Sequence, residues 1–167
     1  MKRAARLAPL ALLLAVGASG KAAPLVIPEV DHIVVTKAAR VMTLYDAHGS
    51  VVHTIHGIQL GDAPQGHKQF QGDERTPEGR YSIDYANPNS SYHLSLHISY
   101  PNAADRAFAA AQGRDPGGLI FIHGQPNWLA GGRIPGDWTD GCIALADEEM
   151  DALWEAVPDG TPIEILP

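Results

Sequence analysis

The sequence predicts a mainly β domain with about two α-helices, and three patterns lead to this fold class. Short runs rich in β-branched residues recur along the chain, separated by clusters of Gly, Asp and Pro. The segment 92–99 alternates apolar and polar residues with the period of two that is typical of a half-buried strand. Helical composition and spacing occur in two segments, 103–112 and the one that begins near Asp147. We therefore expect strands to form most of the core.

The first hundred residues supply most of the expected strands. These strands are 33–36, 40–45, 51–60, 80–85 and 92–99. The three residues 37–39 join the first two runs and predict a hairpin. The polar stretch 61–79 is rich in Gly, Asp and Pro, and a connection of this length in a compact domain is usually functional or packed against the surface.

The expected helices lie in the second half of the chain. The segment 103–112 is Ala-rich and is followed by Gly113, a residue common just past a helix end. The second helix has acidic residues in its first turn, which complement the helix dipole. Its apolar residues recur at helical spacing and are expected to pack in the core: Met150, Leu153, Trp154 and Val157. Two further strands are expected at 119–122 and 162–166.

Composition excludes several classes of protein. The 167 residues include 12 basic and 19 acidic ones, and the resulting net charge of -7 argues against binding of nucleic acid or anionic lipid by bulk electrostatics. A single cysteine excludes an intramolecular disulfide and a Cys-rich zinc module. No cofactor is expected, and the oligomeric state stays open.

The N-terminal segment has the pattern of a signal peptide at 1–20. Lys2, Arg3 and Arg6 precede a ten-residue apolar run, 7–16, and small residues follow it. Ten residues at about 1.5 Å each cannot cross a hydrocarbon core of about 30 Å. We expect an exported protein, periplasmic or otherwise, with a single domain at 21–167 and no stable membrane insertion after cleavage. An uncleaved N-terminal anchor is the alternative.

The chemistry of the sequence is concentrated between residues 121 and 145. His123 follows an apolar run, and Cys142 follows Thr139-Asp140-Gly141. A cysteine nucleophile needs a thiolate, and a nearby imidazole can accept its proton. Gly141 would allow backbone N–H groups to approach a developing oxyanion. The pair alone favours a simpler interpretation, a small buried side chain and an unrelated histidine, over a catalytic pair.

The motifs around this pair resemble those of a known family. His123-Gly124 and Thr139-Asp140-Gly141-Cys142 are separated as in the active-site motif of the L,D-transpeptidase catalytic domain of bacterial cell-wall enzymes. Segment 72–81 resembles the family's TPxG turn and strand, and 95–106 is similar to the branch of small periplasmic members. The likeness covers about residues 31–167.

The resemblance implies a β-sandwich-like mixed sheet with the cysteine at the mouth of a groove. Cys142 would be the nucleophile, and His123 would be the general base and later the general acid. Backbone N–H groups around Gly141 and Cys142 would form an oxyanion hole, and Thr139 would shape the cysteine turn.

Two positions depart from the family pattern. Many members carry a basic or polar residue where Asp140 stands, and many carry Arg or Asn where Ala144 stands. Asp140 would raise the cysteine pKa, so that a protonated His123 would be needed to stabilise a thiolate. The missing side chain at Ala144 leaves the substrate contacts at that point open.

Candidate substrate-binding residues are Gly124, His97, Arg133 and Asp140. His97 would either line the groove or lie on a solvated sheet face. In a strand, His93 and His97 are about 13 Å apart, so we expect no metal site. Arg133 is the one cation of the loop 124–138 and a candidate partner for a substrate carboxylate. That loop is either a lid hinged at Gly131-Gly132 or an ordinary covering loop plugged by tryptophans.

The implied substrates are peptidoglycan stem peptides. Cys142 would attack the carbonyl of the third stem residue, a diaminopimelate, and release the terminal D-alanine. An amine of another stem would then attack the thioester and form a 3–3 cross-link. The same site could use water, as an L,D-carboxypeptidase, or release a wall-linked lipoprotein. A non-catalytic wall-binding protein is the alternative of another class.

Overall fold

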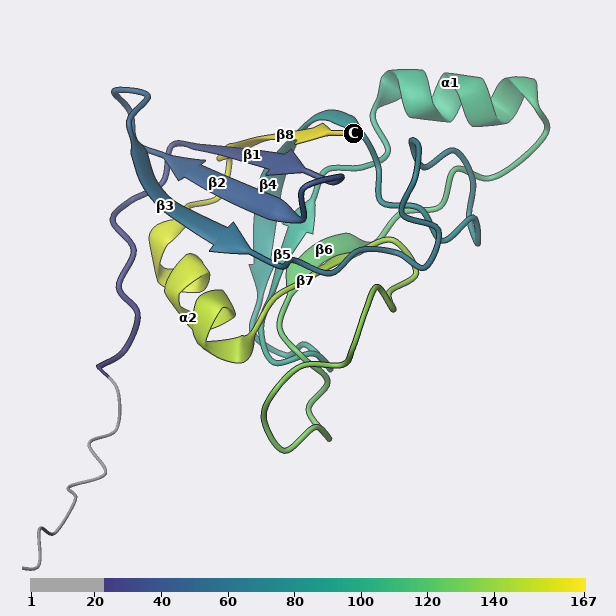
Figure 1. Ribbon diagram of the computed structural model, residues 1–167. Coiled ribbons are helices and arrows are strands. Elements are labelled where there is room, and N and C mark those ends of the chain that lie inside the picture. Colours follow the sequence, from purple (N-terminus) through teal and green to yellow (C-terminus); the bar gives the residue numbers. More distant parts are fainter. Residues whose placement is uncertain (1–22) are drawn as a thin grey trace, which may run out of the picture.

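The computed structural model describes residues 23–167, which form eight strands and two helices (Figure 1). The predicted signal peptide at 1–20 lies outside these residues. Within residues 23–167, no helix combines the length and apolarity needed to cross a membrane. The strands are β1 (His32–Thr36), β2 (Val41–Tyr45), β3 (Val51–His56), β4 (Gly79–Asn87), β5 (Ser95–Ile98), β6 (Ile120–His123), β7 (Ile143–Ala144) and β8 (Pro162–Leu166). The helices are α1 (Ala103–Ala111) and α2 (Asp147–Ala156).

The strands form one mixed sheet in the order β3-β2-β1-β8-β4-β5-β6-β7. Two neighbouring pairs are parallel, β1 with β8 and β6 with β7, and the others are antiparallel. The nine-residue strand β4 pairs with β8 through its first half and with β5 through its second half. The sheet curls at this shared strand (Figure 1), which confirms the expected mainly β, sandwich-like architecture.

The core follows from alternation along the strands and from one helix. In β1 and β2 every second residue is buried, which places Ile33 and Leu44 in the interior. Helix α2 adds Met150 and Leu153, as its apolar spacing predicts. Helix α1 buries only Asp105 and Ala109 and lies apart from α2 in Figure 1. Its first turn is fixed by a capping box between Asn102 and Asp105.

Two predicted strands are shorter in the structure, for local backbone reasons. β3 ends at His56 because Gly57 adopts a φ of 68°, and Gln59 then bridges to Ala144 instead. The run expected at 92–99 is a strand only from Ser95 to Ile98, because His93 has a φ of 63°. The prediction that His93 and His97 lie in the same strand was therefore wrong.

Candidate active site

Cys142 lies at the end of a tight turn that leads into β7. The Thr139 hydroxyl closes this turn, since Oγ1 donates to the Cys142 carbonyl at 2.8 Å and accepts from the Gly141 N–H at 3.2 Å. Thr139 is only 4% exposed. The structure thus gives Thr139 and Gly141 clear roles in holding the turn. Their role in an oxyanion hole stays a prediction. In the structure the Gly141 N–H donates to Thr139 Oγ1.

The glycine of this turn is required by a close backbone approach. Gly141 has a φ of 126°, and a Cβ there would lie 2.5 Å from the Arg75 carbonyl oxygen. Nearby, a Cβ at Gly61 would lie 2.1 Å from the carbonyl oxygen of Glu74. Such distances are far below van der Waals contact, so both positions admit only glycine without backbone movement. The connection 61–79 is therefore packed, backbone against backbone, beneath the cysteine turn.

The sulfur of Cys142 is partly buried and contacts two backbone groups. The Phe121 N–H donates to Sγ at 3.4 Å, and the thiol donates to the Leu119 carbonyl at 3.6 Å. Leu119 adopts a φ of 56°, an uncommon conformation for a residue other than glycine. Burial raises the pKa of Cys142 to about 11, the Phe121 N–H acts against this shift, and the Asp140 carboxylate adds to it.

His123 ends β6 and is almost fully buried, at 4% exposure. Its Nδ1 lies 2.7 Å from the Gly124 carbonyl oxygen, which can only accept, so Nδ1 carries the proton and Nε2 is left as a base. Tyr92 and Trp138 pack on the imidazole, with ring centroids at 4.7 and 5.7 Å. Burial lowers the pKa of His123, and the hydrogen bond to Gly124 offsets only part of that shift.

These pKa directions define the resting state of the pair. Both shifts favour the uncharged forms at neutral pH, a neutral Cys142 thiol and a neutral His123 imidazole. A thiolate stabilised by a protonated His123 stays a prediction from the sequence. Proton transfer would accompany attack on a substrate.

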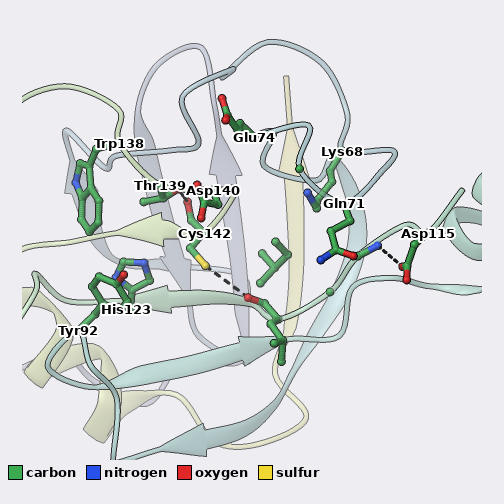
Figure 2. A pocket seen from close by; sticks show the side chains of 15 residues that line it. Lys68, Gln71, Glu74, Tyr92, Asp115, His123, Trp138, Thr139, Asp140 and Cys142 are labelled. Carbon is green, nitrogen blue, oxygen red and sulfur yellow. Dashed lines mark hydrogen bonds between the residues drawn. The ribbon is translucent and has the colours of Figure 1, made fainter.

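The sheet register brings His123 and Cys142 to one face. β6 and β7 are parallel, with His123 opposite Ala144. Residues two apart along a strand point to the same side, so Cys142 lies on the His123 side of the sheet. Both residues line one cavity of about 820 Å³ (Figure 2).

Four parts of the chain supply the rest of the cavity lining: 68–74, Tyr92, 115–120 and 138–140. Figure 2 shows Cys142 between the aromatic group of Tyr92, His123 and Trp138 on one side and the connection 61–79 on the other. The charged lining residues are Lys68, Glu74, Asp115 and Asp140. The three acidic ones are exposed at the rim, whereas Lys68 is only 3% exposed. Sequence reasoning placed Asp140 here but missed Lys68 and Tyr92, because only the tertiary structure buries Lys68 and packs Tyr92 against His123 and Trp138.

The loop 124–138 is fastened to the sheet by two buried glutamines. The side-chain amide of Gln125 donates to Gln59 Oε1 at 3.1 Å and to the Leu145 carbonyl at 2.7 Å. Gln125 Oε1 accepts from the Ile134 N–H at 3.0 Å, and the Gln59 amide donates to the Ile134 carbonyl. Beyond this clamp, Trp128 is 76% exposed and plugs nothing, so the expectation of a plug was wrong for this tryptophan.

Two candidate substrate-binding residues lie away from the cavity. His97 forms a hydrogen bond with Asp84 at 2.6 Å, stacks on Tyr85 and packs against Phe121 of the neighbouring strand, and it does not line the cavity. The Arg133 guanidinium donates to the Gly57 carbonyl at 2.6 Å and pairs with Glu149. The structure therefore does not bring either residue to Cys142.

Gly124 and Ala144 have structural positions beside the site. The Gly124 carbonyl orients His123, and a Cβ on Gly124 would lie 2.6 Å from Asp147 Oδ1. Ala144 is fully buried in β7 opposite His123, so the structure leaves no open space for a longer side chain at this position. Among residues 23–167, no cluster of His, Cys, Asp and Glu could hold a metal ion.

Comparisons with known proteins agree with this geometry. Residues 30–165 match the YkuD family model, described as the L,D-transpeptidase catalytic domain. Over 130 residues the chain is 28% identical to "Putative L,D-transpeptidase YafK" of Escherichia coli (strain K12), covering 75% of this chain and 46% of that protein.

Solved structures give the same picture. Pgp2 of Campylobacter jejuni, a helical cell shape determining protein, superposes with a TM-score of 0.64 at 27% identity, covering 84% of this chain and 50% of that one. An L,D-transpeptidase from Mycobacterium smegmatis shares the fold, with a TM-score of 0.52 at 15% identity over 81% of this chain and 58% of that one. The chain thus spans about half the length of the relatives it matches. On the evidence of the family match over residues 30–165, the chain belongs to the L,D-transpeptidase catalytic-domain family.

Proposed function

We propose that this chain is the catalytic domain of an exported cysteine L,D-transpeptidase that acts on peptidoglycan stem peptides. The observation that carries the proposal is the shared cavity of Cys142 and His123, in which the Nδ1–H of His123 is held by Gly124 and Nε2 is left to accept a proton. The family membership supports the reaction class. The single-domain limits at 21–167 and the signal peptide at 1–20 belong to the same proposal.

The reaction has two acyl-transfer steps, acylation of Cys142 and transfer of the acyl group to an amine. As Sγ attacks the carbonyl of the third stem residue, its proton passes to Nε2 of His123. The tetrahedral adduct then expels D-alanine, whose amine takes that proton, and a thioester on Cys142 remains. A second stem's amine attacks the thioester, gives up a proton to His123, and releases Cys142 as the thiol once that proton returns to sulfur. The product is a 3–3 cross-link.

The experiment uses the purified chain without its first 20 residues and disaccharide-tetrapeptides as substrate. Mass spectrometry should detect cross-linked dimers and free D-alanine. Cys142→Ala and His123→Gln should abolish both products. His97→Gln is the matched control and should retain activity, because His97 lies away from the cavity.

Each other product pattern points to a different function. Tripeptides without dimers would assign an L,D-carboxypeptidase. Release of the linked peptide from a second substrate, a tripeptide stem whose diaminopimelate carries a peptide, without reaction of the tetrapeptide, would assign a lipoprotein-releasing peptidase. Absence of any product, with wild type equal to Cys142→Ala, would leave a wall-binding protein. Pgp2 is described as determining helical cell shape, so a change of cell shape after deletion is the expected cellular effect. Fractionation tests export.

A further inference from the structure

The cavity contains a buried lysine that the reaction just described does not use. Lys68 belongs to the connection 61–79, is 3% exposed, and lines the cavity together with Cys142. Figure 2 shows it with Gln71 and Glu74 on the wall opposite His123. A buried ammonium is costly unless it is paired and its N–H donors are satisfied, so the acceptors around Nζ decide what role it can have.

A second buried lysine shows what a purely structural role looks like. Lys37 is 2% exposed and donates to three acceptors, the Gly66 carbonyl at 2.7 Å, the Thr76 carbonyl at 2.9 Å and Glu78 at 2.9 Å. An ammonium has three N–H donors, so Lys37 is fully satisfied. It does not line the cavity.

Lys68 differs from Lys37 in both respects. Its Nζ donates to Asp73 Oδ1 at 2.9 Å and to the Phe70 carbonyl at 3.1 Å. No third acceptor for Nζ occurs within the described part of the chain, so one donor remains on a group that lines the cavity.

The positive charge of Lys68 is only partly compensated. Its partner Asp73 also accepts backbone N–H groups from Gln69 at 2.7 Å, Phe70 at 3.0 Å and Arg75 at 3.2 Å. Burial opposes ionisation of Asp73, yet these N–H groups and Lys68 together hold its pKa below the ordinary value. The negative charge of Asp73 is therefore shared among four donors, of which Lys68 is one. An anion that reached Nζ of Lys68 would still be attracted to it.

The acidic lining residues do not cancel this attraction. Glu74, Asp115 and Asp140 are exposed at the rim, where water and salt screen them. Lys68 is buried, where electrostatic interactions are stronger. Among the lining residues of this cavity, Lys68 supplies the one lysine or arginine charge.

We infer that Lys68 is a specificity residue that binds a carboxylate of the stem peptide whose carbonyl Cys142 attacks. This inference rests on the proposed function and names a recognition point within it. The stem offers two kinds of carboxylate, the terminal one on D-alanine and those along the stem. A charge-assisted hydrogen bond in a buried site predicts a loss of about 10- to 100-fold in affinity when the ammonium is removed.

The test measures binding separately from turnover. In a Cys142→Ala background, calorimetry gives the Kd of the disaccharide-tetrapeptide and of two analogues, one amidated at the terminal carboxylate and one at the diaminopimelate carboxylate. Lys68→Met should weaken binding of the unmodified peptide about 10- to 100-fold. With Lys68 intact, the protein should bind one of the two analogues poorly, and that analogue identifies the carboxylate that Lys68 binds. The Lys68→Met variant should bind this analogue and the unmodified peptide equally well. Lys68→Arg, which keeps the charge, should retain most of the affinity.

Lys37→Met is the matched control, because it also removes a buried ammonium but should leave Kd within about twofold. Equal affinities of the Lys68 and Lys68→Met proteins, or equal losses in both lysine variants, would overturn the inference. So would tight binding of both analogues by the Lys68 protein, even if Lys68→Met fails to fold. If binding follows the expected pattern but the protein with Cys142 intact shows no turnover, the proposed function fails and the inference about Lys68 stands.

Discussion

Two long segments without regular secondary structure flank Cys142, and they are held in different ways. The connection 61–79 packs backbone against backbone beneath the cysteine turn and is pinned by Lys37 and Lys68. The loop 124–138 is clamped by Gln59 and Gln125 at both of its ends, while Gly131, Gly132 and the rest of its tip are open to solvent. Both are rich in Gly and Pro, so composition alone does not distinguish a fixed wall from a partly anchored loop.

The largest expected effect comes from filling the close approach in the fixed wall. Gly61→Ala would place a Cβ 2.1 Å from the Glu74 carbonyl oxygen, and we expect a loss of about 3 kcal/mol or more in the free energy of unfolding. The matched change in the loop, Gly132→Ala, meets open space at a φ of 81° and should cost only about 1 kcal/mol. Urea denaturation of both variants checks this, and equal costs would contradict the contrast.

The second prediction concerns the thiol that lies between the two segments. Because the pKa of Cys142 is raised to about 11 from 9.0, the thiolate fraction at pH 7 should be about 100-fold lower in the folded protein than in the unfolded chain. Alkylation by iodoacetamide should rise steadily from pH 7 to 10, without a plateau. His123→Gln should leave this profile unchanged, whereas a plateau near neutral pH would reveal a standing thiolate–imidazolium pair.

Turnover should show a separate acid limb. His123 must be neutral to accept the proton, and its pKa is lowered by burial. At pH 7, His123 should therefore be neutral and should not limit the rate. The rate should fall at a pH below the ordinary histidine pKa, where the lowered pKa of His123 lies. An acid limb above pH 7 in the kcat/KM profile would contradict this assignment.

Removing the loop clamp should have an intermediate effect. Gln125→Leu leaves the Ile134 N–H and the Leu145 carbonyl without their partner, at a cost of about 2 kcal/mol. Limited proteolysis should then cut within 126–138. Gln112→Leu, an exposed glutamine after α1, is the control and should leave both readouts unchanged.

The smallest effect is expected at the tip of the loop. Trp128 is 76% exposed, so Trp128→Ala should change the free energy of unfolding by less than about 0.5 kcal/mol and leave kcat/KM unaltered. A tenfold loss in kcat/KM with unchanged stability would show that the loop closes over the cavity as a lid.

The sequence was sufficient for the parts that depend on local pattern. Most strand and helix positions followed from β-branched runs and helical spacing, and the motif spacing predicted that Cys142 and His123 come together. The pairing of β1 with β8 was not predicted, because no local signal reports a partner more than a hundred residues away. His93 misled the strand prediction, since period-two alternation does not reveal a positive φ.

The missed and misplaced site residues share one physical cause. Arg133 looked free because Glu149 and the Gly57 carbonyl are distant in sequence. Lys68 was not singled out within the polar segment 61–79, and only the tertiary structure buries it beside the cavity. Side chains on long connections take their roles from such distant partners, which spacing does not encode.

The place of β8 within the sheet constrains the order in which the protein can assemble. Residues 162–166 form the strand between β1 and β4. Until they have been synthesised and have docked, β1 and β4 each keep one unpaired edge. The continuous sheet therefore requires residues 162–166, and folding should be slow because its pairings are non-local. A chain stopped before residue 162 would expose both unpaired edges to aggregation.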